Sequence, residues 1–324
     1  MHSIAELDRL VAEIVFLGTG SRVTVNELAG RLRASPTEIR QTLSRLSKLG
    51  YPFILRAGLI ERQSFEPIDL QQLRADFSPK RVGRRIEWRL HVRSTQDELK
   101  MIEPEAEDGT VLLGETQDSG RGRLTRSWFA PFGGIWMSIL LRPKWQKSHQ
   151  VPSLAFAASV AKAISTVTGL SPLVKWPNDV TVGSRKVAGI LAEGAYSSNR
   201  LDRLIVGLGV NANMKPTLFP KELRGSATSL SQELGHQIDR NLLTRKILEE
   251  IDNAYGRFES GAAGELLDEA RMACSTVGRK VKITSAEGSF EGEAVDVGDD
   301  GELLLRLRSG AIVRFYAADV IHIR

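Results

Sequence analysis

An arginine- and glycine-rich segment at residues 114–128 holds the side chains that packing explains least. It reads GETQDSGRGRLTRSW, so two glycines alternate with two arginines at 120–123, and Arg126 follows. Glycine permits unusual backbone angles and close approach of a ligand, and arginine offers a fixed fork of donors that suits carboxylate or phosphate. Apolar runs flank the segment at 111–113 and 135–141. We therefore expect an anion-binding loop at the mouth of a sheet rather than a solvated basic turn.

A lysine in a predicted hairpin is the second candidate for anion binding. The turn Gly183-Ser184 separates strands predicted at 179–182 and 185–193, which puts Lys186 just inside the returning strand. By strand alternation it shares a face with Ala188, Ile190 and Ala192. An ammonium on an apolar face is costly to desolvate without an anionic partner. Near a strand end it can also reach water, and the local pattern leaves both interpretations open.

Several familiar motifs are missing from the sequence. It contains no P-loop and no nucleophile elbow, and Gly207-Leu208-Gly209 lacks the third glycine of a dinucleotide fingerprint. The arginine/glycine loop, Lys186 and the turn at 175–179 suit chemistry on a bound anion without a protein nucleophile. Carboxylate activation by ATP is one such reaction, because Arg, Lys and Mg²⁺ offset charge on the phosphoryl oxygens. Trp128 offers a flat face for a ring such as adenine.

Residues 1–62 have the pattern of a small helical domain that binds DNA. Apolar residues at helical spacing predict a first helix over 4–14, and Thr24 and Ser35 can cap helices at 25–32 and 36–49. The last helix has an apolar stripe and a polar, basic face. Two extended runs within 51–62 complete a winged helix-turn-helix. The alternative is an ordinary trihelical domain, which also has one polar face. The candidate DNA contacts are Ser35, Thr37, Arg40, Gln41, Ser44 and Arg45.

The rest of the chain divides into three further parts, and the whole predicts an α+β protein. Residues 63–86, with a basic cluster and a short helix at 68–76, are expected to form a solvated linker. Residues 87–275 alternate strands and helices as in one mixed α/β domain. Residues 276–324 show four short strands separated by turn signals, as in a small SH3-like β-barrel.

Composition places the chain among ordinary globular proteins. It has 324 residues, 42% hydrophobic content and a net charge of +5, which permits a nucleic-acid partner without requiring one. Its one cysteine, Cys274, cannot form an internal disulfide, which fits a reducing cytosol and predicts a cytoplasmic protein. The scattered histidines argue against a structural zinc site. The longest apolar run, 154–164, is interrupted by Lys162, so we expect no membrane span.

Three motifs together resemble those of the bacterial biotin protein ligases. They are GRGR at 120–123, KWPND at 175–179 and RKVAGIL at 185–191, and GLGVNAN at 207–213 fits the same family. The resemblance covers the whole chain, and the N-terminal part looks like that of the bifunctional subgroup, which also represses the biotin operon. It implies a mixed α/β catalytic domain like that of class II synthetases.

The resemblance also implies roles for individual residues. Biotin would contact the polar segment Ser94, Thr95 and Gln96, together with Gln117 and a lid formed by Arg121, Gly122 and Arg123. Lys186 would bind the biotin carboxylate and act in catalysis with Arg121, Arg123 and Asp179, the last orienting the incoming amine or taking its proton. ATP or the adenylate would contact Arg123, Lys175, Asn178, Asn211 and Asn213, and Trp128 would stack on adenine. No side chain is predicted to bind metal.

The implied reaction has two steps. Biotin and MgATP give biotinyl-5′-AMP, and a lysine of the biotin carboxyl carrier protein of acetyl-CoA carboxylase then attacks it. The adenylate-filled enzyme would form a homodimer on operator DNA. Three departures are visible: Leu124-Thr125-Arg126 replaces the usual Arg-Gly-Arg, Gln96 replaces asparagine, and the wing lacks Gly-x-Gly-Tyr. The alternatives are a lipoate–protein ligase, a non-catalytic biotin sensor, and a ligase whose N-terminal domain no longer binds DNA.

Overall fold

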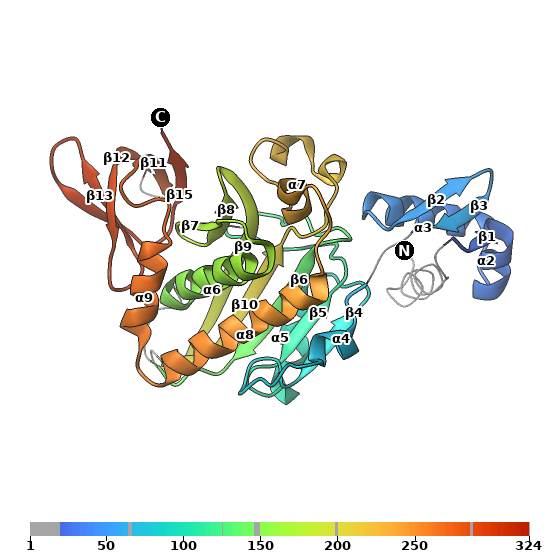
Figure 1. Ribbon diagram of the computed structural model, residues 1–324, viewed down its shortest axis with the longest axis horizontal. Helices are drawn as coiled ribbons and strands as arrows, with labels where there is room; N and C mark the ends of the chain where they lie inside the picture. Colours follow the sequence, from blue (N-terminus) through green and yellow to red (C-terminus); the bar gives the residue numbers. More distant parts are fainter. Residues whose placement is uncertain are drawn as a thin grey trace.

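In the part of the N-terminal unit that the structure describes, two helices lie beside a small sheet (Figure 1). The computed structural model describes residues 20–63, 67–124, 126–145, 150–197, 200–285 and 288–323, so the helix predicted at 4–14 lies outside the described residues. The elements are β1 Arg22–Thr24, α2 Val25–Leu32, α3 Pro36–Lys48, β2 Phe53–Arg56 and β3 Leu59–Arg62. The sheet order is β1-β3-β2, and β2 and β3 form the hairpin expected of a wing.

Both described helices begin as their sequences predict. The side chains of Thr24 and Ser35 each accept the backbone N–H of the glutamate three residues later. The side chain of that glutamate in turn accepts the backbone N–H of the capping residue. The apolar stripe of α3, including Leu43 and Leu46, is fully buried in the core of the unit. Local capping and helical periodicity are therefore sufficient to define these two helices.

The segment predicted as a solvated linker is instead part of the main core, which corrects that expectation. Ile68, Leu73 and Val82 are buried there, and α4 Leu70–Arg74 packs against α8 Arg240–Glu259. Asp252 accepts the backbone N–H groups of residues 80–82 at 2.6–2.9 Å. The basic side chains of this segment predict exposure to solvent, but its scattered apolar residues pack into the core and fix the position of the backbone.

The central domain is built on a seven-stranded sheet in the order β4-β5-β6-β10-β9-β8-β7. Only β4 and β5 pair in parallel; the other neighbouring pairs are antiparallel. The strands are β4 Ile86–Arg89, β5 Val111–Gly114, β6 Ile135–Leu141, β7 Leu173–Lys175, β8 Asp179–Val182, β9 Arg185–Ser197 and β10 Arg200–Val210. The sequence predicts the first strand of this domain at 88–92, whereas β4 begins at Ile86 and ends at Arg89.

Helices cover both faces of this sheet. The helices are α5 Thr95–Ile102, α6 Gln150–Thr168, α7 Leu230–Leu234, α8 Arg240–Glu259 and α9 Ala263–Met272. Successive residues of one strand belong to different apolar clusters, as Leu204 and Ile205 do: one cluster includes α6 and α8, the other α5. By length and composition α6 could cross a membrane, but 61% of its apolar window is buried, and it packs on α8 and β9 as a core helix.

The C-terminal module is a five-stranded antiparallel sheet in the order β14-β13-β12-β11-β15. Its strands are β11 Lys280–Ser285, β12 Gly288–Val297, β13 Leu303–Leu307, β14 Ile312–Phe315 and β15 Asp319–His322. The sequence pattern predicts the first four and misses β15. The module shares the main apolar cluster, and Nε1 of Trp176 donates to the carbonyl of Gly301 at 2.9 Å. It lies at the opposite end of the central domain from the N-terminal unit (Figure 1).

Candidate active site

A cavity of about 530 Å³ lies against the central sheet. The segments predicted to bind ligands meet there: the start of α5, the arginine/glycine loop, the turn at 175–179 and the strands β9 and β10. The first residues of β15 also contribute to the wall. Chain segments that are far apart in sequence therefore form one site, and the missed strand is part of it.

The arginine/glycine loop is a short hydrogen-bonded hairpin, which we call the lid hairpin (residues 120–124 and 126–128). The amide N–H of Gly122 donates to the carbonyl of Arg126 at 2.7 Å, and that of Trp128 donates to the carbonyl of Gly120 at 2.7 Å. A Cβ on Gly120 would lie 2.5 Å from the Trp128 carbonyl oxygen. The left-handed backbone conformation occurs at Leu124, with φ of 53°. Glycine at position 120 thus serves close approach rather than unusual angles.

The indole of Trp128 lies against two glycines of the central sheet. Gly189 on β9 and Gly209 on β10 are cross-strand partners. A Cβ on either would come within 2.5–2.8 Å of the indole. The two glycines therefore let an aromatic ring lie close to the strands, where it forms one wall of the cavity.

The position of Lys186 corrects the strand pattern predicted for it. Thr181 pairs with Lys186, but the preceding residue Val180 pairs with Ala188, so β9 carries one extra residue at this point. Such a β-bulge reverses the alternation of side chains. Ala188 belongs to the buried core, whereas Lys186 lines the cavity, as Gly189 does. The lysine thus does not share the face predicted for it, because the bulge turns it toward the site.

Lys186 has an anionic and an aromatic partner in the cavity. Its Nζ lies 2.6 Å from Oδ1 of Asp179 and 4.8 Å from the centre of the Trp128 ring. These contacts offset the cost of removing an ammonium from water. Of the two interpretations that the sequence leaves open, the structure thus supports the partnered lysine.

The cavity carries more positive than negative charge. Arg123, Lys175 and Lys186 line it, together with Asp179 and Asp319. Burial lowers the pKa of the Lys175 ammonium, and Asp179 counteracts this. Burial likewise lowers the pKa of the Arg123 guanidinium, again opposed by Asp179. Cations that lose solvation in this way are suited to an anionic ligand.

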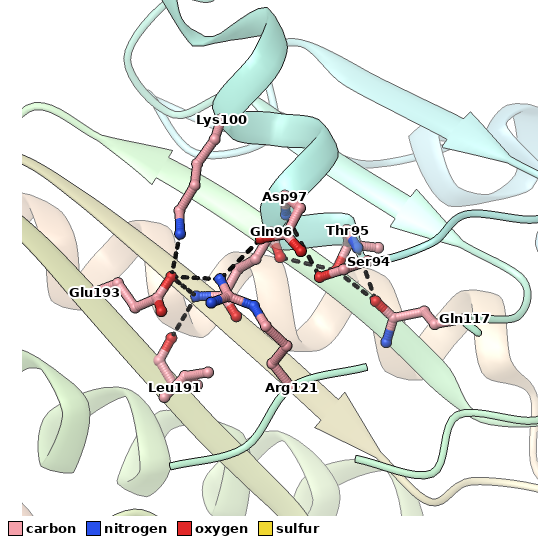
Figure 2. A network of polar contacts seen from close by, with 10 residues as sticks. Ser94, Thr95, Gln96, Asp97, Lys100, Gln117, Arg121, Leu191 and Glu193 are labelled. Carbon is pink, nitrogen blue, oxygen red and sulfur yellow. Dashed lines mark hydrogen bonds and ion pairs between the residues drawn. The ribbon is translucent and has the colours of Figure 1, made fainter. Parts of the chain in front are cut away.

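The polar segment at the start of α5 forms the other end of the cavity. Ser94 caps the helix, and the Thr95 N–H donates to Oε1 of Gln117 at 2.8 Å. Nε2 of Gln96 donates to Glu193 at 3.1 Å. Figure 2 shows these contacts as one network. Glu193 is missing from the sequence-based candidates, since a single carboxylate within a strand has no distinctive motif.

The predicted asparagines differ in position. Asn178 and Asn211 line the cavity, and their amides also bind protein carbonyls, those of Ile190 and Thr228. Asn213 does not belong to the cavity lining: its amide donates to the carbonyl of Ile238 at 2.8 Å and accepts from the N–H of Ile238 at 3.0 Å. The structure thus gives Asn213 a structural contact, since this amide ties down the loop before α8.

The candidate DNA contacts form a separate surface. Ser35, which caps α3, and the five polar residues on the helix are all exposed. Arg45 also forms an ion pair with Asp118, which lies beside Gln117. Asp118 accepts a hydrogen bond from His91 at 3.0 Å, and this bond is the main reason that the pKa of Asp118 lies below its ordinary value. The helix therefore touches the central domain at one of its predicted DNA contacts.

Known proteins match parts of both the central domain and the C-terminal module. A family model described as the biotin/lipoate A/B protein ligase family matches residues 88–211, and one described as the biotin protein ligase C terminal domain matches 276–323. The bifunctional ligase/repressor BirA of Bacillus subtilis is 30% identical over 304 residues, covering 92% of this chain and 93% of the relative.

Two further known proteins match a smaller share of this chain. The biotin--[acetyl-CoA-carboxylase] ligase of Mycobacterium tuberculosis is 33% identical over 225 residues, 67% of this chain and 80% of that protein. The structure of biotin protein ligase from Aquifex aeolicus in complex with biotin and ATP is 32% identical, with a TM-score of 0.66, covering 74% of this chain and 100% of that one. With this fold, this cavity and these relatives, the chain belongs to the biotin protein ligase family.

Proposed function

We propose that this protein is an ATP-dependent biotin–protein ligase that modifies a lysine of the biotin carboxyl carrier protein of acetyl-CoA carboxylase. The observation that carries the proposal is the convergence of Arg123, Lys175 and Lys186 beside the Trp128 ring in one cavity, next to the polar segment 94–96. That arrangement can bind a carboxylate and a triphosphate together.

The first step joins biotin to AMP. A biotin carboxylate oxygen attacks the α-phosphorus of MgATP, the bond to the bridging oxygen breaks, and pyrophosphate leaves. Lys186 holds the carboxylate, and Arg123 with Lys175 offsets the charge that develops on the phosphoryl oxygens. Trp128 stacks on the adenine ring. Mg²⁺ arrives with ATP as part of the substrate.

The second step transfers biotin to the carrier. The ε-amine of the carrier lysine attacks the carbonyl carbon of biotinyl-5′-AMP, an amide forms, and AMP leaves. Asp179, which lies against Lys186, orients the amine or takes its proton. The lid hairpin keeps water from the reactive anhydride until the amine arrives.

Incubation of the full chain with biotin, ATP, Mg²⁺ and the carrier domain tests this function. We expect the intact mass of the carrier to rise by biotin less one water, and only when ATP is present. A carrier of unchanged mass, with active control ligase alongside, contradicts the proposal. The main alternative is lipoate transfer, since the matching family model includes lipoate ligases. Pyrophosphate exchange that responds to lipoate and not to biotin would support that alternative.

We propose a second role as a biotin-responsive repressor. The exposed polar face of α3 supports it, as does similarity over 92% of the chain to a bifunctional ligase/repressor. The adenylate-bound protein would dimerise and place two winged units on a palindromic operator. A gel shift with DNA upstream of the biotin genes, with and without biotin and ATP, tests this role. Failure to form a complex in either condition rules it out.

The finer structural assignments belong with this proposal. They are a winged helix-turn-helix domain at 1–62, a catalytic domain like that of class II synthetases at 87–275, and an SH3-like domain at 276–324. A cytoplasmic location follows from the proposed substrates, because ATP and carboxylase subunits are found there. Fractionation of cells followed by immunodetection of the protein tests it.

A further inference from the structure

Glu193, on β9, brings together three side chains beside the cavity. Its Oε2 lies 2.7 Å from Nη2 of Arg121, 2.7 Å from Nζ of Lys100 and 3.1 Å from Nε2 of Gln96. Figure 2 shows donors from the lid hairpin and from α5 converging on this one carboxylate. No motif and none of the roles discussed above includes Glu193.

The carboxylate is held in its charged form. Burial alone would raise the pKa of Glu193, but hydrogen bonds from Lys100 and Arg121 outweigh it and keep the pKa below its ordinary value. Glu193 is therefore a fixed negative charge at neutral pH. It is placed to attract the lid hairpin toward the sheet.

Arg121 is engaged by carboxylates on two elements. Besides Glu193, its Nη2 lies 3.1 Å from Oδ1 of Asp97 in the first turn of α5. Arg123, two residues later in the hairpin, reaches the amide of Asn178 beside Lys175 and Asp179 instead. Arg121 therefore ties the hairpin to the protein, while Arg123 remains available to a ligand.

The same carboxylate orients the amide of Gln96. Nε2 donates to Glu193 and, at 3.3 Å, to the carbonyl of Leu191. Within the described residues, Oε1 accepts no hydrogen bond. It lies over Gly207, where a Cβ would come within 2.6 Å of it, and both residues line the cavity. The amide thus presents an acceptor, which complements an N–H of a cyclic urea.

We propose that Glu193 is a positioning residue: it latches the lid hairpin through Arg121 and turns the Gln96 amide so that its oxygen receives a ureido N–H of the substrate. This inference rests on the proposed biotin ligase function. It assigns Arg121 to lid closure rather than to contact with the reacting atoms. It also explains how glutamine can replace the usual asparagine at position 96, because the longer side chain can donate to Leu191 and Glu193 of β9.

The decisive measurement separates binding from chemistry. In biotin-dependent ATP–pyrophosphate exchange, Glu193→Ala should raise the KM for biotin about 10- to 100-fold, the range for loss of charge-assisted hydrogen bonds, with kcat within about three-fold. The preformed adenylate should also leave the variant faster. Glu193→Gln keeps the size of the side chain and should fall between wild type and Glu193→Ala. Glu105→Gln, which removes an exposed carboxylate, is the matched control.

A double-mutant cycle tests the latch itself. If Arg121 and Glu193 act as a unit, the KM of Arg121→Ala/Glu193→Ala should be close to that of the worse single variant. Multiplied effects of the two changes overturn the latch, and so does an unchanged biotin KM in Glu193→Gln or Glu193→Ala. Lower thermal stability with an unchanged KM would indicate a structural carboxylate only. If the wild type shows no biotin-dependent exchange, the proposed function fails instead, so the two failures are distinguishable.

Discussion

The cations of the cavity and those of α3 contrast in how they are held. Lys186 lies between Asp179 and the Trp128 ring, and burial lowers the pKa of both Lys175 and Arg123. The polar side chains of α3, by contrast, are exposed along one face of the helix. A site that does chemistry needs its charges oriented before the substrate arrives. A surface that binds DNA gains its contacts only in the complex. The structure therefore says more about how the cavity would work than about how the polar face of α3 would.

Of the changes considered, we expect the largest effect from substitution of Lys186. Lys186→Met removes the ammonium and retains most of the side-chain length, so we expect biotin-dependent pyrophosphate exchange to fall by about 10²- to 10³-fold, the loss typical of one transition-state donor. Lys162→Met, at an exposed lysine of α6, is the control and should retain wild-type exchange. Wild-type turnover in Lys186→Met would remove the lysine from the mechanism.

The next largest effect concerns the support of the aromatic ring. Gly209→Ala places a methyl group 2.5 Å from the Trp128 indole, so the ring must move. We expect the KM for ATP to rise about ten-fold or more, since stacking on an aromatic ring contributes about 1–3 kcal/mol. Gly225→Ala meets no atom within 4 Å and serves as control. Equal ATP affinity in the two variants would exclude Trp128 as the adenine platform.

Asp179→Asn should change the pH dependence of the cavity. Asp179 raises the pKa of Lys175 against the effect of burial, so its neutralisation lets that pKa fall further. Lys175 acts while protonated, and activity is lost as pH rises through its pKa. The alkaline limb of kcat/KM should therefore move to lower pH. Asp319→Asn should shift it in the same direction by less, because Asp319 contributes less to that pKa. A limb that stays in place in both variants contradicts this assignment.

On α3, the expected effects appear only with DNA present. Arg40→Ala should weaken operator binding about ten-fold and reduce the salt dependence by about one charge per subunit, as for a lost phosphate contact. Ligase activity of the same preparation is the internal control and should not change. A gel-shift titration at several salt concentrations measures both quantities. Unchanged binding would place DNA on another surface.

We expect the smallest effect at the contact between α3 and the central domain. Arg45 pairs with Asp118 and so cannot bind a phosphate without leaving it. Asp118→Asn removes this competing anion, so we expect operator binding to tighten about two- to five-fold, within the range for an exposed ion pair. Fluorescence anisotropy with labelled operator resolves such a change. Weaker binding in Asp118→Asn would show that the pair supports the DNA-bound form.

Local sequence signals predicted more of the fold than of the contacts between its parts. The caps at Thr24 and Ser35 and the strands at 111–113 and 135–141 depend on neighbouring residues, and they agree with the structure to within about one residue. The place of the linker depends instead on distant residues: its apolar side chains pack in the main core, and Asp252, some 170 residues further along the chain, accepts the backbone N–H groups of residues 80–82. Long-range pairing of this kind leaves no periodic trace in the segment itself.

Most of the candidate residues belong to the sequence motifs, and most of them line the cavity. The orientation of their side chains could not be predicted from those motifs. The face of Lys186 depends on a single extra residue in β9, which alternation cannot reveal. Glu193 acquires its partners from the lid hairpin and α5, so its importance appears only in three dimensions. The last strand, β15, is short and lies in a sequence without a clear alternation.

The lid hairpin and the residue two positions before it are held by other parts of the molecule. Asp118 pairs with Arg45 of the N-terminal unit, and Arg126 pairs with Asp319 of the C-terminal module. Because exposed Ile321 of β15 lines the cavity, a fluorescent dye on Ile321→Cys, in a background without Cys274, would lie at the cavity wall. Its emission would then report occupancy of the cavity in real time, giving a sensor for the vitamin that requires no added reporter domain.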